Sequence, residues 1–455
     1  MERTLAIETV KKIGKKVRLC GWVNARRDHG KLVFVDLRDR SGIIQLVGDE
    51  KLGDLRTADV VEVEGSVRKR PENLVNPKLA TGEIEIEVEK IKILAKSKEL
   101  PFDTQGEGRE INEELRLQYR YLDLRRPRMV KNLELRHQVI KFIRDWLDKR
   151  GFIEIETPIL TKATPEGARD FLVPSRLQPG KFYALPQSPQ QYKQLLMVAG
   201  FEKYYQIARC FRDEDLRADR QLEFTQLDIE MSFVEREDVM KLIEALMIEL
   251  TESLEKKIYC QPFPRIKYQE AIKKFGDDKF DLRQKKDPNV LAFAFVIDQP
   301  LFEWKKEENR WDAMHHPFTS PNPEDLFLLE KGEIASVRSW QYDLVCNGFE
   351  IGGGSIRITN PKLQEKIFEI MGHKPAEIQK KFGHLLKAFE YGVPPHGGIA
   401  LGLDRLVSIF ASEASIREVI AFPVTASGQT AVMDAPSKVD PQQLKELEID
   451  VKTKK

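Results

Sequence analysis

The sequence predicts an α+β protein of more than one domain, with a small β-barrel at the N-terminus and a larger domain that combines helices with β-hairpins. Three observations support this fold class. Residues 1–100 alternate short β-rich runs with turns, an amphipathic pattern covers Met129–Lys149, and strand pairs joined by polar loops follow it. A length of 455 residues suits two or three domains of about 100–200 residues each.

The composition excludes several classes of function. Lys and Arg number 74 and Asp and Glu 73, a net charge of +1, so attraction to nucleic acid requires local clustering of basic residues. The longest apolar run, Leu291–Ile297, is far shorter than the ~20 residues of a membrane-spanning helix. The N-terminus has no apolar signal core, so we expect a cytoplasmic protein without membrane attachment. The four cysteines are widely spaced without a CxxC pair, which argues against a disulfide framework and a zinc site.

The N-terminal barrel is predicted from β-rich runs separated by turn residues. They cover residues 17–23, 32–38, 43–47, 60–67 and 84–88. Strands at this spacing are typical of a small barrel or a sandwich. An OB-type barrel with Arg26, Arg27 and Phe34 on neighbouring strands could stack unpaired bases and hold phosphates. A solvated face with Phe34 in the core is the alternative, and composition does not separate the two.

Residues 105–128 separate the predicted domains 1–104 and 129–455. They are charged and aperiodic, and Pro127 lies near their end. We interpret them as a hinge. The arginines at 125–128 are more typical of a structural clamp than of a binding patch.

The larger domain begins with a predicted amphipathic helix. In Met129–Lys149, apolar residues such as Val139, Ile143 and Leu147 recur at helical spacing, which indicates one buried face. Gly151 ends the helix, and an alternating strand follows that leads to Pro158. This helix and strand alone carry little functional information.

A polar hairpin follows further along the chain. A strand over Tyr204–Phe211 leads into the wholly polar loop 212–221, and a second strand returns through Phe224. In that strand Gln226, Asp228 and Glu230 share one face. Burying such a face is costly unless it lines a wet site. A polyanion-binding loop and an ordinary solvated hairpin both fit the pattern.

A second hairpin turns at Asn347-Gly348, the strongest two-residue turn signal. In this register Val345 faces Glu350, and Asp343 lies diagonally from Glu350 at about 7–8 Å or less. Two carboxylates so placed repel each other unless a cation such as Mg²⁺ lies between them. The glycines at 352–354 favour close approach of a ligand to the backbone. A solvated pair on an outer face is the alternative.

Near the C-terminus a glycine-rich strand, 397–402, runs into an apolar helix. It lacks the GK[ST] ending of a Walker A phosphate loop. Arg405 at the start of that helix could bind a phosphate or pair with a carboxylate of the protein.

Taken together and in this order, these motifs resemble the class II aminoacyl-tRNA synthetases, and among them the bacterial type of aspartyl-tRNA synthetase. The resemblance covers nearly the whole chain. The barrel is similar to the anticodon-binding domain, the helix and strand ending at Pro158 to motif 1, CFRDEDLRADRQLEFTQLDIE (210–230) to motif 2, and GIALGLDRLVSIF (398–410) to motif 3. TPEGARDFLVPSR (164–176) and QSPQQYKQ (187–194) resemble the mobile loop and amino-acid pocket of the aspartate branch.

The resemblance implies a catalytic domain with an antiparallel sheet flanked by helices, a homodimer, and a two-step reaction. Aspartate and ATP form aspartyl-adenylate and pyrophosphate, and the aspartyl group is then transferred to the 3′ end of tRNA(Asp), with tRNA(Asn) as a second candidate. Mg²⁺ is the implied cofactor.

The resemblance also implies site residues. The implied catalytic residues are Arg212, Glu350 and Arg405. The ATP-binding residues are those three with Asp213, Glu214, Gln221, Phe224, Gly402, Leu403 and Asp404. The aspartate-binding residues are Glu166, Gln190, Lys193, Arg212, Asp228, His315 and Arg357. Asp343 and Glu350 are the implied ligands of Mg²⁺, and Arg27, Phe34 and Gln45 the anticodon-binding residues.

The chain departs from the resemblance at one place. Bacterial members usually carry a whole inserted domain between motif 2 and motif 3. Here the sequence that precedes it is present at 265–283, and a short linker near 284–292 stands in its place. We therefore expect amino-acid activation to be retained and tRNA affinity to be weaker.

Two alternatives are weighed against this interpretation. A sibling enzyme for asparagine or lysine would keep the ATP-binding residues and change the pocket cations, whereas Lys193 and Arg357 are both present. A non-catalytic RNA-binding relative would show decay in motif 2 or motif 3, whereas Arg212, Glu350 and Arg405 are retained.

Overall fold

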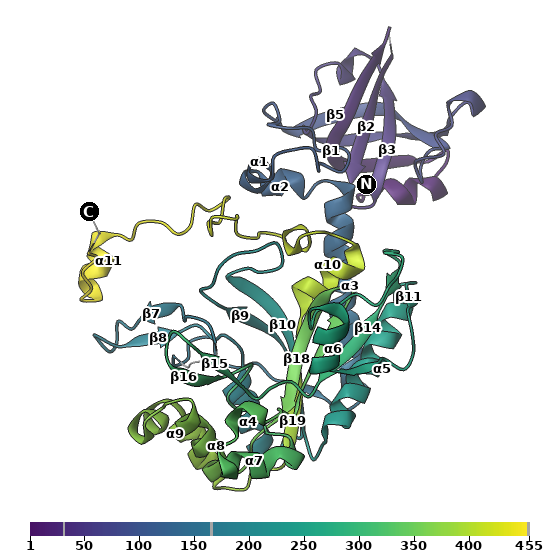
Figure 1. The fold of residues 1–455 in the computed structure, drawn as a ribbon. Helices are drawn as coiled ribbons and strands as arrows, with labels where there is room; N and C mark the ends of the chain where they lie inside the picture. The colour runs from purple at the N-terminus through teal and green to yellow at the C-terminus, as the bar shows by residue number, and fades with distance from the viewer. Residues whose placement is uncertain (31, 164–166, 453–455) are drawn as a thin grey trace. The chain divides into compact units, whose positions relative to one another are not determined.

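The computed structural model describes residues 1–30, 32–163 and 167–452. The chain divides into two compact units, Met1–Asp103 and Thr104–Lys455, which are coloured purple to blue and blue to yellow in Figure 1. We refer to them as the barrel unit and the larger unit.

The barrel unit is a closed five-stranded barrel with the strand order β1-β2-β3-β5-β4. The strands are β1 (Lys16–His29), β2 (Leu32–Asp39), β3 (Gly42–Gly48), β4 (Val60–Lys69) and β5 (Ile84–Ala95). Alternate residues point inward, so Val33, Val35 and Leu37 of β2 are buried. The predicted OB-type barrel is confirmed.

The larger unit is built on an eight-stranded mixed sheet with the order β12-β14-β17-β18-β19-β10-β9-β6. The strands are β6 (Ile153–Glu154), β9 (Lys203–Phe211), β10 (Glu223–Ser232), β12 (Arg265–Lys267), β14 (Phe293–Ile297), β17 (Gln341–Cys346), β18 (Phe349–Ile356) and β19 (His396–Gly402). The six central strands pair antiparallel, and the outer pairs β12–β14 and β6–β9 are parallel.

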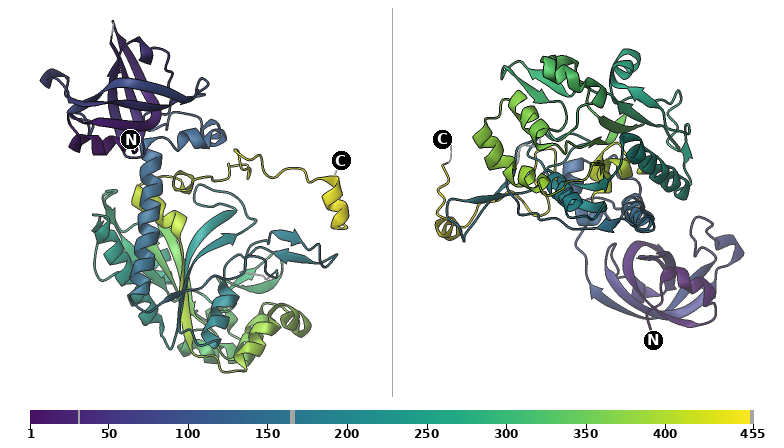
Figure 2. Two further views of the ribbon diagram at one scale, coloured as in Figure 1. Left: turned by 180° about the vertical axis from the view of Figure 1, so that it is seen from behind. Right: turned by 90° about the horizontal axis from the view of Figure 1, so that it is seen from below.

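Three helices cover one face of this sheet: α3 (Pro127–Asp148), α5 (Arg236–Ser253) and α10 (Leu403–Ala411). Figure 2 shows α3 running along the strands. The predicted helix therefore forms, with Pro127 in its first turn, where the missing N–H costs nothing. Its residues Val139, Ile143 and Leu147 are fully buried in the main core.

Smaller elements complete the fold. The remaining α-helices are α1 (Glu113–Gln118), α2 (Arg120–Asp123), α4 (Gln190–Val198), α6 (Tyr268–Phe275), α7 (Leu326–Lys331), α8 (Pro361–Ile370), α9 (Pro375–Phe389) and α11 (Pro441–Glu446). The remaining strands are β7 (Leu172–Pro174), β8 (Phe182–Ala184), β11 (Lys257–Ile258), β13 (Val290–Leu291), β15 (Phe302–Lys305) and β16 (Arg310–Ala313). The 3-10 helices are η1 (Ala6–Lys11), η2 (Glu50–Leu52), η3 (Glu72–Leu74), η4 (Pro323–Asp325), η5 (Ile334–Ser336) and η6 (Ile416–Val419).

The segment 105–128 differs from the aperiodic hinge expected of it. It contains α1 and α2 and belongs to the larger unit. Arg116, Arg120 and Arg126 surround the fully buried carboxylate of Asp123 at 3.2, 2.8 and 2.8 Å. The charged side chains around Asp123 are thus paired in the interior, and apolar periodicity along the sequence cannot reveal such pairing.

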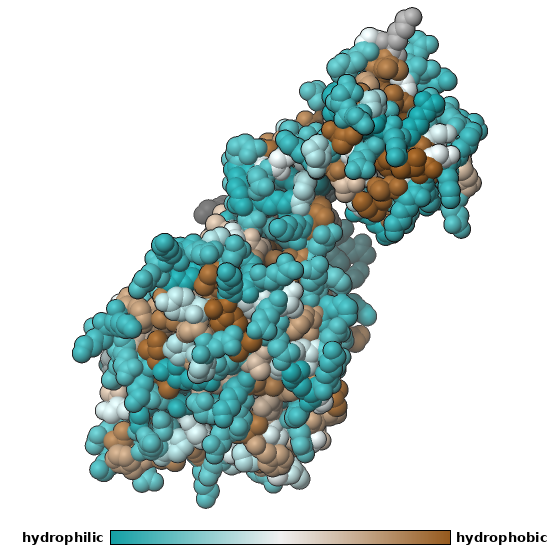
Figure 3. Space-filling view, turned by 90° about the vertical axis from the view of Figure 1, so that its right-hand side faces the viewer, coloured by the Kyte–Doolittle hydropathy of each residue, from teal (hydrophilic) through white to brown (hydrophobic). Residues whose placement is uncertain are grey.

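Hydrophilic side chains cover most of the face of the molecule that Figure 3 shows, and apolar side chains lie among them in small groups. Within the described residues, no helix has the length and apolar character needed to cross a membrane.

Candidate functional site

A cavity of about 760 Å³ lies on the larger unit where motif-like segments from four parts of the chain meet. Strands β10, β17, β18 and β19 contribute to its wall, together with α4, the loop 212–221 and the loop after α6. In β10 the residues alternate, so Leu227 and Ile229 enter the core while Gln226 and Asp228 line the cavity. The sheet thus separates an apolar face from a polar one, as the sequence of β10 predicts.

One end of the cavity holds a buried network of two cations and two carboxylates. Lys193 Nζ lies 3.0 Å from Asp228 Oδ1 and 3.3 Å from Glu230 Oε2. Arg357 donates from Nε and Nη2 to the two Glu230 oxygens at 2.8 and 3.1 Å. All four side chains are at most 4% exposed, so their opposite charges compensate each other in a dry environment.

The pKa values of the two carboxylates in this network are shifted in opposite directions. Burial raises the pKa of Asp228 even though Lys193 opposes the shift. Burial also acts on Glu230, but Arg357 and Lys193 outweigh it and lower the pKa of Glu230 to about 2. Asp228 Oδ2 has no hydrogen-bond partner among the described residues, and Asp228 lines the cavity. It is therefore an acceptor available to a cationic group of a ligand.

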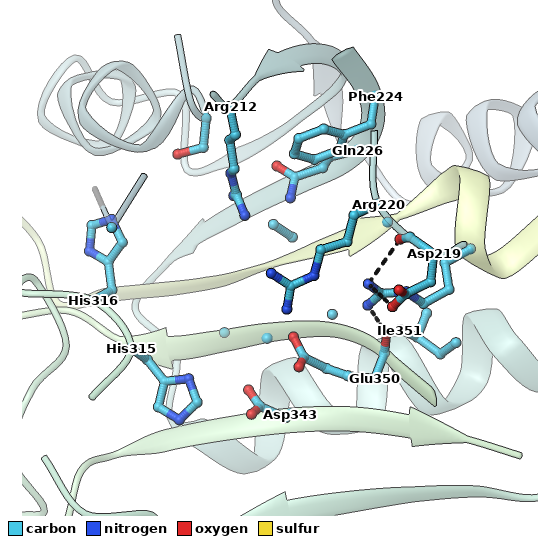
Figure 4. A pocket seen from close by; sticks show the side chains of 18 of the residues that line it. Arg212, Asp219, Arg220, Phe224, Gln226, His315, His316, Asp343, Glu350 and Ile351 are labelled. Atoms are coloured by element: carbon cyan, nitrogen blue, oxygen red, sulfur yellow. Dashed lines mark hydrogen bonds and ion pairs between the residues drawn. The ribbon is translucent and has the colours of Figure 1, made fainter. Parts of the chain in front are cut away.

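The middle of the cavity carries Arg212 and Phe224. The guanidinium of Arg212 lies 5.0 Å from the centre of the Phe224 ring, and the Nε of Arg212 is buried without a hydrogen-bond partner among the described residues. Figure 4 shows both side chains on the wall opposite Asp343 and Glu350. Nearby, Gln221 accepts from the backbone N–H of Val424 at 2.9 Å, and Arg220 lies 3.4 Å from Glu214. An unpaired donor on Arg212 suits an anionic ligand.

The other end of the cavity is formed by the second hairpin and the start of α10. Val345 pairs with Glu350 as the Asn-Gly turn predicts, and a bulge between Leu344 and Val345 then shifts Asp343 opposite Gly353. Arg405 donates to the backbone carbonyl of Glu350 and to Asp219 Oδ2, the latter at 3.0 Å. Figure 4 shows the Asp343 and Glu350 carboxylates close together, with His315 beside them.

The carboxylates of this end are held in different ways. Asp343 accepts from Gln299 at 2.6 Å and from Gln341 at 2.9 Å, and burial followed by the nearby Glu350 charge raises its pKa although His315 opposes the shift. Burial acts in the same direction on Glu350, but Lys279 and Arg405 outweigh it and lower its pKa. Two oxygen-donor side chains facing one cavity suit a hard cation such as Mg²⁺.

These two carboxylates do not form a complete protein cage. Among the described residues, no group of three or more His, Cys, Asp or Glu side chains is arranged to hold a metal. A cation bound by Asp343 and Glu350 would therefore take its other ligands from water or from phosphate oxygens, as Mg²⁺ commonly does.

Two of the glycines at 352–354 are required by the neighbouring strand. A Cβ on Gly352 would lie 1.9 Å from the carbonyl oxygen of Ala400, and one on Gly354 would lie 2.2 Å from that of Gly398. Strand β19 therefore requires Gly352 and Gly354. A Cβ on Gly353 would instead meet the Asp343 carboxylate. All three glycines line the cavity, so close approach of a ligand to their backbone stays a prediction.

Most of the residues predicted for the site come together in this cavity. Those that line it are Gln190, Lys193, Arg212, Glu214, Gln221, Phe224, Asp228, His315, Asp343, Glu350, Arg357, Gly402, Asp404 and Arg405. The carboxylate of Asp404 is already committed to Arg136 and to the backbone N–H of Thr225. Two predicted ATP-binding residues lie elsewhere: Leu403 is buried in the main core, and Asp213 pairs with Arg169 outside the cavity. Glu166 lies outside the described residues.

Several lining residues escaped the sequence interpretation. They are Ser188, Asp219, Arg220, Asp277, Lys279, His316 and Gln341. Arg220 and Asp219 lie in the polar loop that the sequence singled out, so its charge was the available signal. Asp277 and Lys279 belong to a loop more than sixty residues before Glu350, and no local pattern connects the two.

The predicted anticodon-binding residues share one outer face of the barrel unit. Arg27 pairs with Phe34 across β1 and β2, and Asp36 pairs with Gln45 across β2 and β3. Phe34 is half-buried beside the ring of His29, with 5.6 Å between ring centres, and lies outside the barrel core. The alternative that places Phe34 in the core is therefore wrong. Arg27 forms a bidentate pair with Asp36 at 2.9 Å, and Gln45 donates to Glu85 at 3.1 Å.

Comparisons with known proteins agree with these two units. Residues 112–426 match the family of class II tRNA synthetases (D, K and N), and residues 17–94 match the OB-fold nucleic acid binding domain. The aspartate–tRNA(Asp/Asn) ligase of Dictyoglomus turgidum is 45% identical over 97% of this chain and 96% of its own length. That of Natranaerobius thermophilus is 44% identical over 96% of this chain and 97% of its own length.

Solved structures show the same fold. The asparaginyl-tRNA synthetase of Pyrococcus horikoshii complexed with asparaginyl-adenylate has a TM-score of 0.75 at 25% identity and covers 93% of this chain and 98% of its own. The aspartyl-tRNA synthetase of Entamoeba histolytica has a TM-score of 0.74 at 22% identity, over 93% of this chain and 91% of its own.

The lengths of the sequence relatives differ from that of this chain. The alignment with the Dictyoglomus turgidum protein spans 572 positions, and this chain has 455 residues. That relative therefore has at least 117 residues without a counterpart here. A gap of this size agrees with the absence of an inserted domain.

Proposed function

The chain belongs to the class II tRNA synthetases of the D, K and N group, and from its cavity we propose that aspartate is the amino acid it activates. It is an aspartate–tRNA ligase. The buried pair Lys193 and Arg357 carries the choice of amino acid, because both side chains line the cavity and offer only hydrogen-bond donors. A carboxylate side chain accepts from both, whereas the amide of asparagine would place its own donors against them.

The reaction has two steps. An α-carboxylate oxygen of aspartate attacks the α-phosphorus of ATP, giving aspartyl-adenylate and pyrophosphate, and the aspartyl group is then transferred to the 3′ end of the tRNA. No protein nucleophile is required, because in-line placement and stabilisation of developing charge are sufficient. The cavity is suited to these tasks, since Arg212 offers an unpaired donor at its centre.

The residues divide between the substrates. Arg212 binds the α-phosphate and the reacting carboxylate. Asp228 accepts a hydrogen bond from the ammonium group of aspartate, and Gln190 lies beside that group. Phe224 stacks on adenine, and Arg405 binds the γ-phosphate. These roles are the ones that the resemblance implies, and the fact that all these side chains line one cavity supports them. Asp343 and Glu350 would hold Mg²⁺, which neutralises phosphate charge when bound.

The outer face of the barrel unit formed by Arg27, Phe34 and Gln45 binds the anticodon of tRNA(Asp). The half-buried ring of Phe34 supports a stacking role, since a base can cover its exposed part. Transfer to tRNA(Asn) as well is supported by the relatives, which are named aspartate–tRNA(Asp/Asn) ligases. The enzyme acts in the cytoplasm as a homodimer, as the family resemblance implies.

The short linker at 284–292 lowers the affinity for tRNA without affecting activation. The linker contains β13 and contributes none of the described residues that line the cavity. A KM for tRNA equal to that of a relative with the insert would contradict this part of the proposal.

Amino-acid-dependent ATP–pyrophosphate exchange tests the function. The purified chain is assayed with Mg²⁺ and with aspartate, asparagine or lysine in turn, without tRNA. We expect exchange with aspartate alone. Exchange with asparagine or lysine would overturn the roles of Lys193 and Arg357, and absence of exchange with all three would favour a non-catalytic RNA-binding protein. Lys257→Met, which changes an exposed strand residue outside the cavity, is the matched control for Lys193→Met.

A further inference from the structure

The loop after α6 brings a cation to the cavity that the proposed function does not use. Gly276 ends α6 in the left-handed conformation with φ of 77°, and Asp277 then accepts from the backbone N–H of Lys279 at 3.1 Å. Both Asp277 and Lys279 line the cavity. The turn therefore fixes the backbone from which the Lys279 side chain extends.

Lys279 contacts one of the two carboxylates proposed for Mg²⁺. Its Nζ lies 3.1 Å from Glu350 Oε2, with the two side chains 43% and 32% exposed. Partly exposed pairs between flexible side chains contribute little to stability. The lysine can therefore leave Glu350 at small cost when a more highly charged partner enters.

The same arrangement recurs at two other places in the cavity. Arg405 lies 3.0 Å from Asp219, and Arg220 lies 3.4 Å from Glu214. Each of the three cations is thus neutralised by a carboxylate of the protein. A triphosphate carries most of its negative charge on the β- and γ-phosphates, and it can replace these carboxylates as the partner of the cations.

We propose that Lys279 leaves Glu350 when ATP binds, hydrogen-bonds the β- and γ-phosphate oxygens, and remains with pyrophosphate as it departs. The proposal rests on the proposed function. In the first step a bond forms from the aspartate carboxylate oxygen to the α-phosphorus, and the bond from that phosphorus to the bridging oxygen breaks. Pyrophosphate keeps the electron pair of the broken bond, and the ammonium of Lys279 offsets the added charge without losing its proton.

Equilibrium binding of ATP and AMP to three variants tests this role. Lys279→Met removes the charge and keeps the length, Lys279→Arg keeps the charge, and Lys273→Met changes an exposed lysine of α6 outside the cavity. We expect Lys279→Met to raise the Kd for ATP about tenfold, as for the loss of one charged hydrogen bond, and to leave the Kd for AMP unchanged. Lys279→Arg should recover much of the affinity, and Lys273→Met should match the unmodified protein.

The results separate several explanations. Equal losses for ATP and AMP, or no loss for ATP, would overturn the role of Lys279. If the unmodified protein bound no ATP, the proposed function would fail and the role of Lys279 with it. If the unmodified protein and Lys279→Met bound ATP equally, only the role of Lys279 would fail.

In Lys279→Met, Glu350 loses its partner, and its unpaired charge is a second explanation for weaker ATP binding. A second experiment tests that explanation. In EDTA, ATP binding is compared between Glu350→Gln and the double variant Glu350→Gln/Lys279→Met. A further loss in the double variant supports direct contact of Lys279 with phosphate, and equal binding overturns it. In the exchange assay, Lys279→Met should raise the KM for pyrophosphate about tenfold and leave the KM for aspartate unchanged.

Discussion

Replacing Lys193 by methionine should destabilise the larger unit and remove aspartate recognition together. Lys193 forms ion pairs of 3.0 and 3.3 Å with Asp228 and Glu230, and all three side chains are at most 1% exposed. At an effective dielectric constant of about 20 each attraction amounts to about 5 kcal/mol. Much of this is offset by the cost of burying the lysine, which methionine avoids. Removing one partner of a buried pair typically costs about 3–5 kcal/mol, and we expect a loss of that size.

The deficit should depend on pH. Burial raises the pKa of Asp228 in the folded chain even with Lys193 present, and the loss of Lys193 raises it further. A group whose folded pKa is raised binds more protons when folded, so stability increases as pH falls. The loss in Lys193→Met should therefore be smaller at pH 5.5 than at pH 8.

Chemical unfolding followed by circular dichroism at both pH values measures this effect, with Lys257→Met as the control. The KM for aspartate in the exchange assay should rise at least about 100-fold, as for truncation of a buried charged partner. A Lys193→Met protein with unchanged unfolding free energy and unchanged KM for aspartate would refute the reasoning.

Three further predictions follow from the geometry. The pKa of Glu230 is lowered from 4.5 to about 2, so its stabilisation of about 3 kcal/mol is present above pH 4.5 and is lost as pH falls toward 2. In Glu230→Gln the free energy of unfolding should therefore fall less over this pH range, as measured by acid unfolding followed by tryptophan fluorescence. Asp343→Asn should reduce the kcat of ATP–pyrophosphate exchange about 100-fold, as for the loss of one charge-stabilising group, and added EDTA should abolish exchange in the unmodified protein. Phe34→Ala should raise the KM for tRNA about tenfold, because stacking on one base contributes about 1–3 kcal/mol, while exchange without tRNA stays unchanged; an equal loss in both assays would contradict anticodon stacking.

Local patterns predicted those parts of the fold that depend on local rules. The Asn-Gly turn specifies the hairpin register, so the pairing of Val345 with Glu350 followed from the sequence. Strand alternation likewise placed Gln226 and Asp228 on one face of β10. The bulge beside Val345 was not predicted, because the Asn-Gly turn specifies only the pairing next to it.

Features that depend on distant contacts could not be predicted in this way. The glycines at 352–354 were attributed to close approach of a ligand, whereas the fold also uses Gly352 and Gly354 to make room for β19 and Gly353 to make room for the Asp343 carboxylate. The arginines around Asp123 were assigned to a hinge with a structural clamp at its end, because a charged, aperiodic segment gives no sign that a buried carboxylate compensates it. Lys279 was missed for the same reason, since only the folded chain brings it to Glu350.

The pairing of charges before substrate binding explains how one cavity can hold many charged groups. Lys193, Arg357 and Lys279 each have a carboxylate partner of the protein, so the empty site avoids the large cost of unpaired buried charge. The two ends differ in exposure: Lys193 and Arg357 are almost fully buried, whereas Lys279 is 43% exposed. A buried network resists rearrangement and favours one carboxylate-bearing ligand. An exposed pair exchanges partners easily, which suits phosphates that must bind and then leave within one turnover.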